Sequence, residues 1–316
     1  MTPKTTRTNV ARAAGVGLAL LALVLLCPAP AAAQGDGPRS QTLLPTGYNF
    51  VVPAYLGLDG DYDFTGTILQ PNADVKSDIF VVTYTRAFSL GGRYAQIWIN
   101  PIFGSIDADV RAVNRTVNVN TSGLGDAVAS FKVGLVGAPA RGIPAFVKEP
   151  QTFQVSAFVS TTIPVGSYDR DRLLNLGTNR WAVRVGTPIV MPWGTNTARA
   201  TFLEVFPSVS FFQDNDEPTG GATLKSQDPL FQLESHLSHN FHPKFWMSGD
   251  LRYFGGGETT TDGISDDNHI NETGAGVSAG YAIAKFLSVQ ASYARRLKTG
   301  DQRDLHMVRV KLALVF

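Results

Sequence analysis

The sequence of 316 residues contains a single cysteine, Cys27, and after position 33 it has neither a long apolar run nor a basic tract. One cysteine cannot form a disulfide framework. A membrane-spanning helix needs about 20 consecutive apolar residues, so helical spans are excluded from that part of the chain. Basic and acidic side chains nearly balance, 27 against 26, and this composition argues against nucleic acid as a partner.

The first 33 residues have the three parts of a secretory signal peptide. Three basic residues precede an apolar core at 15–26, which is too short to span a membrane, and Ala31, Ala32 and Ala33 follow it. We expect cleavage after Ala33, which also removes Cys27. The remaining chain carries 24 basic and 26 acidic side chains, a net charge of −2.

The rest of the chain is dominated by alternation of apolar and polar residues, the pattern of strands with one apolar and one polar face. In the last segment one face carries Val308, Val310, Leu312, Leu314 and Phe316. The pattern predicts twelve strands, near 47–57, 78–89, 94–106, 126–136, 151–164, 180–190, 198–211, 229–238, 245–254, 271–282, 286–297 and 305–316.

The connections between these strands indicate how they are arranged. Connections after strands 1, 3, 5, 7 and 9 are long and polar, whereas those after strands 2, 6, 8 and 10 are tight. Long and short connections at opposite ends are typical of an outer-membrane barrel, with extracellular loops and periplasmic turns. We therefore predict an all-β fold: an antiparallel transmembrane β-barrel of about 12 strands over 47–316, preceded by a periplasmic leader at 34–46. The long connection 137–150 breaks the rule, and the sequence offers no reason for it.

A secreted β-sandwich is the competing fold, because its strands alternate in the same way. It predicts connections of similar length at both ends and gives no role to a terminal aromatic residue. Phe316 ends the chain in phase with the apolar face of the last strand, as is common in barrels that the barrel-assembly machinery inserts. The sequence therefore favours the membrane barrel.

Four short motifs resemble, in order and spacing, the outer-membrane transporter family named after the MetA pathway of phenol degradation. The resemblance spans roughly 47–316 and rests on 122–126 (SGLGD), 162–169 (TIPVGSYD), 175–181 (NLGTNRW) and the pairs Gly255-Gly256 and Asp262-Gly263. It implies a barrel that passes small, often aromatic, compounds. Each motif alone also reads as a turn whose glycines supply positive φ. The motif residues to which we assign a structural role are Gly123, Leu124, Gly125, Asp126, Pro164, Gly166, Gly177 and Trp181.

Strand parity assigns charged side chains to the polar face, which lines the lumen of a membrane barrel. A charge on the lipid face would cost about 2 to 4 kcal/mol at the midplane. These charges either select a solute or pair with one another, since unpaired charges in a narrow lumen are costly. The candidates are Arg184, Glu204, Glu234, His236, Asp250, Arg252, Glu272, Arg296, Arg309 and Lys311.

Four aromatic residues, Trp98, Phe158, Phe202 and Phe206, also have lumen parity. They either form an apolar path for aromatic solutes or fill space. The leader at 34–46 either folds into the periplasmic mouth or is disordered, and disorder is the commoner state of such a segment.

No cofactor or metal is expected. His236, His239 and His242 are spaced by three, which on a strand places neighbouring members on opposite faces. The acidic segments 59–63 and 214–217 lack the spacing of a calcium loop, and we expect them to be solvated, with divalent cations bridging them to lipopolysaccharide. A hydrolase would need Ser292 and His306 on one face, but their parities differ.

The sequence thus predicts a protein of the bacterial outer membrane, in contact with lipid and lipopolysaccharide, that lets small hydrophobic or aromatic, phenol-like solutes pass without catalysis. The alternatives are a structural or adhesive barrel without transport and, less favoured, an outer-membrane hydrolase.

Overall fold

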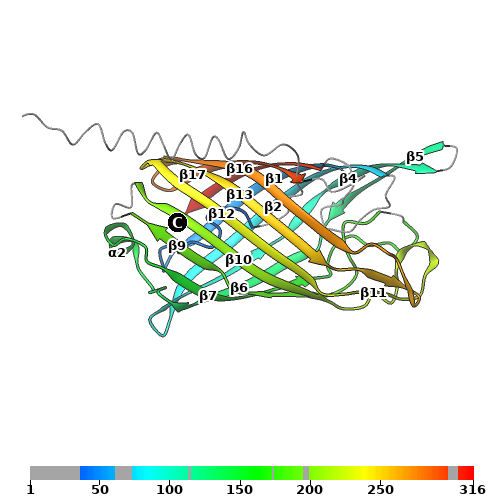
Figure 1. The fold of residues 1–316 in the computed structure, drawn as a ribbon, viewed down its shortest axis with the longest axis horizontal. Helices are drawn as coiled ribbons and strands as arrows, with labels where there is room; N and C mark the ends of the chain where they lie inside the picture. Colours follow the sequence, from blue (N-terminus) through cyan, green and yellow to red (C-terminus); the bar gives the residue numbers. More distant parts are fainter. Residues whose placement is uncertain (1–35, 61–72, 113–114, 173, 195–198, 298–304) are drawn as a thin grey trace, which may run out of the picture.

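The computed structural model describes residues 36–60, 73–112, 115–172, 174–194, 199–297 and 305–316. Nearly all of this chain is strand, and the strands are tilted along one elongated body (Figure 1). The elements are β1 (Asn49–Gly60), β2 (Ala73–Leu90), β3 (Arg93–Asn100), β4 (Ile102–Ala112), β5 (Arg115–Leu124), β6 (Ala127–Val136), α2 (Ile143–Lys148), β7 (Gln154–Ile163), β8 (Ala182–Gly186), β9 (Ile189–Trp193), β10 (Thr201–Phe212), the 3-10 helix η2 (Thr219–Gly221), β11 (Lys225–Gln227), β12 (Leu230–His242), β13 (Phe245–Gly256), β14 (Thr259–Thr261), β15 (Ile264–Ser265), β16 (Ile270–Ala284), β17 (Leu287–Leu297) and β18 (His306–Val315).

Three of the barrel strands are interrupted once. β3 continues as β4 after Pro101, β8 continues as β9 after Pro188, and β5 continues as β6 after Gly125 and Asp126. Proline cannot donate a ladder hydrogen bond, which accounts for two of the interruptions. With each pair counted as one strand, the described chain has twelve barrel strands, as predicted.

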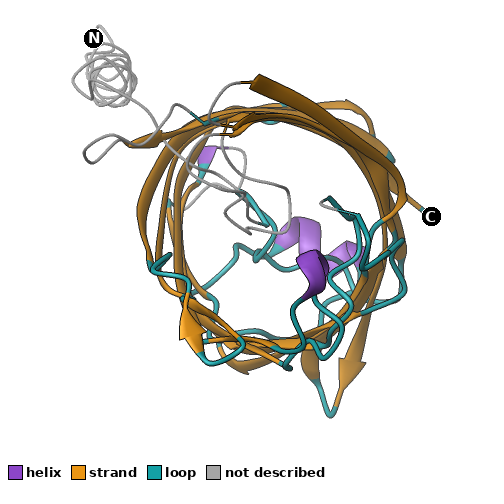
Figure 2. Ribbon diagram, turned by 90° about the vertical axis from the view of Figure 1, so that its right-hand side faces the viewer, coloured by secondary structure: helices purple, strands orange, loops and turns teal. Residues whose placement is uncertain are grey.

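The twelve strands close into an antiparallel ring. β1 pairs with β2 on one side, at Phe50 with Thr85, and with β18 on the other, at Phe50 with Val315. The N–H of Asn49 and the carbonyl oxygen of Phe316 lie 2.9 Å apart, and the N–H of Phe316 and the carbonyl oxygen of Asn49 lie 3.0 Å apart. Figure 2 shows the closed ring, with loops reaching into its interior. No helix in the described ranges is long and apolar enough to cross a membrane.

The two ends of the barrel differ as the connections predicted. The end where β1 begins and β18 ends, here the terminal end, has short turns such as Gly91-Gly92 and His242–Phe245. The opposite end, here the loop end, carries the long connections, and β5 projects beyond the rim there (Figure 1). Three predicted loops contain strands instead. Segment 107–125 is mostly the hairpin of β4 and β5. Segment 255–270 contains β14 and β15, which form a small sheet with β11 from segment 212–228.

The long connection 137–150 at the terminal end packs against other parts of the chain. It contains α2, and Ala138 joins a buried apolar cluster with Leu43, Phe50, Ala87 and Tyr94. The N–H of Thr46 donates to the carbonyl oxygen of Arg141 at 2.8 Å. The connection therefore contacts both the leader and the barrel wall.

Candidate functional site

The described barrel is apolar outside and polar inside. In β12, Glu234 and His236 are buried, whereas Phe231 and Leu237, which have the opposite strand parity, are exposed. In β18, Val308 is 47% exposed and its neighbour Arg309 is 8% exposed. This inverted distribution is that of a wall with lipid on one side and an enclosed lumen on the other.

The predicted lumen charges lie inside the barrel. Glu204, Glu234, His236, Arg252, Glu272, Arg296 and Arg309 are all buried, and Arg184, Asp250 and Lys311 contact buried groups or the leader. Strand parity therefore placed them correctly.

Many of these charges pair with one another around Glu234. One carboxylate oxygen of Glu234 lies 3.0 Å from Nη2 of Arg184 and 3.5 Å from Nη2 of Arg252. The other oxygen lies 3.7 Å from Nε2 of His236, whose Nδ1 is 2.9 Å from Oδ1 of Asp250. On the adjacent strands β16 and β17, Nε of Arg296 lies 3.3 Å from Oε2 of Glu272. Mutual pairing is the alternative that these contacts favour.

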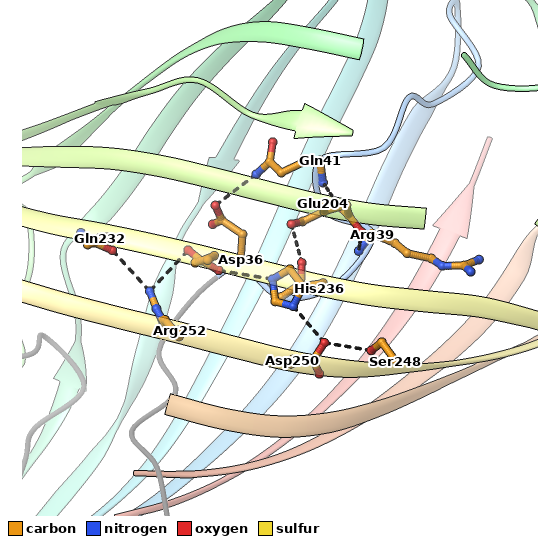
Figure 3. Close-up of polar contacts among 12 residues, drawn as sticks. Asp36, Arg39, Gln41, Glu204, Gln232, His236, Ser248, Asp250 and Arg252 are labelled. Atoms are coloured by element: carbon orange, nitrogen blue, oxygen red, sulfur yellow. Dashed lines mark hydrogen bonds and ion pairs between the residues drawn. The ribbon is translucent and has the colours of Figure 1, made fainter. Parts of the chain in front are cut away.

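Glu204 has a different partner, the N-terminal leader. Its two oxygens accept hydrogen bonds from the backbone N–H groups of Arg39 at 2.6 Å and Gln41 at 3.1 Å. The Nζ of Lys132 donates to the carbonyl oxygen of Gln41 at 3.1 Å, and the Nζ of Lys311 donates to that of Asp36 at 2.8 Å. Charged side chains of the wall thus satisfy the backbone of a segment that has no strand partner (Figure 3).

Arg39 anchors the leader through its side chain as well. Its guanidinium donates to Oγ of Ser238 at 3.2 Å and to Oδ1 of Asn240 at 2.7 Å. It also lies 4.4 Å from the ring centroid of Trp246 and 5.1 Å from that of Phe202, within the range of cation–π attraction. Residues 36–46 are therefore ordered inside the barrel, and the expectation of a disordered leader is wrong for them.

Three of the four predicted lumen aromatics gather on the wall beside the leader. The ring centroids of Trp98 and Phe158 are 5.7 Å apart, and those of Phe158 and Phe206 are 5.0 Å apart with an edge-to-face angle of 80°. Arg184 covers this cluster, with Cζ 4.5 Å from the centroid of Phe206. The fourth, Phe202, contacts Arg39 instead.

A small cavity remains between the leader and the wall. It measures about 30 Å³ and is lined by Gly37 and Pro38 of the leader and by His236, Asp250 and Arg309, among others. Such a space holds about two water molecules. Gly37 has φ of 80°, and a Cβ atom there would lie 1.8 Å from Nη2 of Arg309. Glycine therefore lets the leader lie directly against the wall.

Three of the recognised motifs meet around Asp126 at the loop end. Its carboxylate accepts hydrogen bonds from the N–H of Gly166 at 2.9 Å and from the N–H and hydroxyl of Thr178 at 2.7 and 2.6 Å. Gly166 and Gly177 pack so closely that a Cβ on either would lie within 3 Å of the other's backbone. The motif residues thus tie the start of β6 to both ends of the connection between β7 and β8.

The remaining motif residues also lie at the loop end and contact neighbouring segments there. A Cβ on Gly123, whose φ is 153°, would lie 2.5 Å from Oγ of Ser167. The N–H of Ser167 donates to the carbonyl oxygen of Leu124 at 2.7 Å, and the N–H of Gly125 donates to that of Ile102 at 2.9 Å. Pro164 directly follows β7, and the carbonyl oxygen of Trp181 accepts from Gln213 at 2.9 Å.

The connection between β7 and β8 also fills part of the lumen. Leu174 and Leu176 are buried with Val75, Ile79 and Ile106, which lie on β2 and β4. The barrel is therefore narrowed by the leader from the terminal end and by this connection from the loop end.

The histidines and the Ser292–His306 pair that the sequence analysis considered as possible sites do not come together. Nδ1 of His239 contacts Oγ1 of Thr201 at 2.8 Å, and Nδ1 of His242 accepts the N–H of Lys244, so neither joins His236. Nδ1 of His306 lies 2.8 Å from the hydroxyl of Tyr293, whereas Ser292 bonds Ser278 on the inner face. Of the acidic segments, residues 61–63 lie outside the described residues. Among the residues described, no group of three or more metal-binding side chains comes together.

Sequence reasoning did not single out Asp36, Arg39, Gln41 or Lys132. Lys132 has the lumen parity of Ser130 and Gly134 and could have been found in that way. The leader residues carry no such signal, because they belong to no strand and their partners on the wall lie more than 90 positions away.

Comparison with known proteins agrees with this architecture. The model of the family described as "Putative MetA-pathway of phenol degradation" matches residues 57–304. An outer-membrane channel from Pseudomonas putida F1 has a similar fold, with a TM-score of 0.74 at 21% identity over 89% of this chain and 99% of that one. The β domain of the Bordetella autotransporter BrkA matches less well, with a TM-score of 0.49 at 8% identity over 86% and 100%. No curated protein sequence matches the chain.

Proposed function

The chain belongs to the family described above for the MetA pathway of phenol degradation, and from that membership we propose that it is a passive channel for small hydrophobic or aromatic, phenol-like compounds. The observation that carries the proposal is the cluster of Trp98, Phe158 and Phe206 on the inner wall. A polar lumen has no need of aromatic rings packed against one another. A row of rings offers an aromatic solute edge-to-face contacts that water cannot replace.

We place this channel in the bacterial outer membrane, with the terminal end in the periplasm and the loop end outside the cell. The apolar outer wall supports contact with lipid, and the signal peptide supports export. Under this proposal, purified protein begins at Gln34 and mass spectrometry detects no molecule that retains residues 1–33. Lipopolysaccharide and the assembly machinery would be its partners at the membrane.

No step of passage requires a cofactor or chemical reaction in this proposal. The solute moves down its gradient, and the lumen selects it by contact with aromatic rings and paired charges. The charge network around Glu234 keeps the wall in one arrangement, so the rings stay in contact.

Entry of 4-nitrophenol into vesicles with a lipopolysaccharide outer leaflet tests the proposal, since such a leaflet slows apolar solutes. The protein should speed entry of 4-nitrophenol but not of maltose. Phe158→Ala combined with Phe206→Ala should reverse the gain. Phe231→Ala, which removes a ring from the outer face of β12, should leave it unchanged. If the intact protein speeds neither solute, the barrel is structural or adhesive.

A further inference from the structure

The leader places one carboxylate, that of Asp36, beside the aromatic cluster of the lumen. Its Oδ2 lies 3.5 Å from Nη1 of Arg184 and accepts a hydrogen bond from Nε2 of Gln41 at 3.2 Å. Figure 3 shows the side chains of Asp36 and Gln41 pointing toward each other. The carboxylate of Asp36 thus contacts one leader residue, Gln41, and one residue of the wall, Arg184.

Arg184 joins this carboxylate to the rings. Its guanidinium lies 4.5 Å from the centroid of Phe206 and 5.6 Å from that of Phe158, and its Nε donates to Oγ of Ser208 at 2.9 Å. Arginine suits this double role, because its planar group stacks on aromatic rings and its N–H groups bind carboxylates. One guanidinium thus binds a carboxylate and also lies over aromatic rings.

Asp36 is the exchangeable partner of Arg184. Glu234 lies closer to Arg184, at 3.0 Å, and its side chain is 2% exposed, whereas that of Asp36 is 30% exposed. Glu234 is also held by Arg252 and His236 and belongs to a strand. Asp36 belongs to the leader, so it can leave without breaking the barrel.

On the basis of the proposed channel function, we propose that Arg184, Phe206 and Phe158 form a solute site for aromatic carboxylates, and that Asp36 occupies its carboxylate position when no solute is bound. The ring of a benzoate-like solute packs against Phe158 and Phe206, which are 6% and 2% exposed with the leader in place, so the part of the leader that carries Asp36 moves aside for the solute to enter. Its carboxylate takes the N–H group of Arg184 that faces Asp36, and the Nζ of Lys311, which donates to the backbone of Asp36, supplies a second donor.

This assignment predicts an order of affinity among simple probes. Benzoate makes both the ring contacts and the charge-assisted hydrogen bonds, whereas phenol lacks the charge and acetate lacks the ring. Each missing part should weaken binding about tenfold. Cyclohexanecarboxylate keeps the charge and the size, so its deficit against benzoate isolates the aromatic contacts.

Isothermal titration calorimetry tests this order of affinity. The purified full-length protein in detergent is titrated with sodium benzoate, phenol, sodium acetate and sodium cyclohexanecarboxylate. Arg184→Gln should weaken benzoate binding about tenfold and leave phenol binding nearly unchanged. Asp36→Asn should strengthen benzoate binding, because a competing internal carboxylate lowers the fraction of protein that can bind.

Arg180→Gln is the matched control. Arg180 likewise lies over a phenylalanine ring, with Cζ 4.8 Å from the centroid of Phe212, but near the loop end of the wall. Arg180→Gln removes the same charge as Arg184→Gln, four residues away in the sequence, and should not change benzoate binding. If Arg184→Gln does not fold, Asp36→Asn still decides, since that change lies outside the barrel wall.

Benzoate binding no tighter than acetate or phenol binding, or equal binding by wild type and Asp36→Asn, would overturn the site. The vesicle experiment with neutral 4-nitrophenol separates this failure from failure of the channel. If 4-nitrophenol enters faster while benzoate does not bind, the channel stands and the carboxylate site falls. If neither occurs, both proposals fall.

Discussion

At the scale of single residues, buried carboxylates in this barrel hold backbone that has no strand partner. Glu204 binds two N–H groups of the leader, and Asp126 binds the N–H groups of Gly166 and Thr178. Both carboxylates therefore order a segment that enters the lumen. A charged acceptor forms stronger hydrogen bonds than a neutral one, so one side chain can hold such a segment.

Asp126→Ala should loosen the connection between β7 and β8 without unfolding the barrel. The N–H of Gly166 and the N–H and hydroxyl of Thr178 lose their acceptor in a buried place. This loss should destabilise the closed connection by about 2 kcal/mol or more. Tryptic cleavage after Arg170 and Arg172 should become at least about tenfold faster, because cleavage follows the population of the open form. Asp109→Ala removes an exposed carboxylate that accepts a hydrogen bond from Asn118, and it should not change the rate. Equal cleavage of both variants would show that Asp126 does not hold the connection.

Asp262 should make the small sheet at the loop end sensitive to acid. Hydrogen bonds from the hydroxyl and N–H of Thr223 and the N–H of Leu224 lower the pKa of Asp262 from its usual value. A depressed folded pKa contributes stability above the unfolded pKa of about 3.9, and that stability is lost as the pH falls through the folded value. Exchange of the Thr223 and Leu224 amide hydrogens, corrected for intrinsic rates, should therefore rise below about pH 4. In Asp262→Asn this rise should be absent; its persistence would assign the effect to another group.

Strand parity predicted which charges and rings face the lumen, because burial of one face repeats every two residues. It could not predict which of them contact each other. Arg184 and Glu234 are 50 positions apart and meet only because β8, β10 and β12 are neighbours in the ring. The partners of Glu204 could not be predicted for the same reason, since Arg39 is 165 positions away.

At the scale of elements, the boundaries of most strands were predictable and those of the hairpin of β4 and β5 were not. Beyond the membrane both faces of a strand meet water, so apolar alternation fades. Residues 115–124 contain polar residues on both faces, and they were predicted as loop. The connection 137–150 was unexplained for a related reason: it contacts the leader, which no local pattern records.

Deletion of Phe316 should impair assembly far more than deletion of one residue from 255–270. Phe316 pairs with Asn49 at the seam between β18 and β1, and its ring is exposed on the outer face at the terminal end. Aromatic residues favour such positions at a membrane interface. The measurement is the yield of heat-modifiable barrel in gel electrophoresis. Equal yields from the two deletions would contradict a role of Phe316 in assembly.

At the scale of the whole molecule, the wall and its contents have separate roles. Backbone ladders close twelve strands into a ring, and this ring needs no lumen contact to be complete. The leader and the connection between β7 and β8 then narrow the lumen from its two ends. Twelve strands enclose more space than the eight of a filled barrel and less than those of an open porin. Conduction therefore depends on whether the inserted segments stay in place.

Displacing the leader should open the channel, and Gly37→Val is the change that tests it. Gly37 has φ of 80°, and a Cβ there would lie 1.8 Å from Nη2 of Arg309, so either this guanidinium or the leader must shift, and we expect the leader to move because valine adds two further methyl groups at this contact. Single-channel conductance in a planar bilayer should rise above that of wild type, because the leader fills part of the lumen. Gly47→Val separates this effect from backbone strain. Gly47 also has positive φ, of 92°, yet nothing lies within 4 Å of its Cβ position, so this variant shares the strain but not the clash. Conductance that rises equally in both variants would trace the effect to strain, and unchanged conductance in Gly37→Val would mean that the leader does not limit passage.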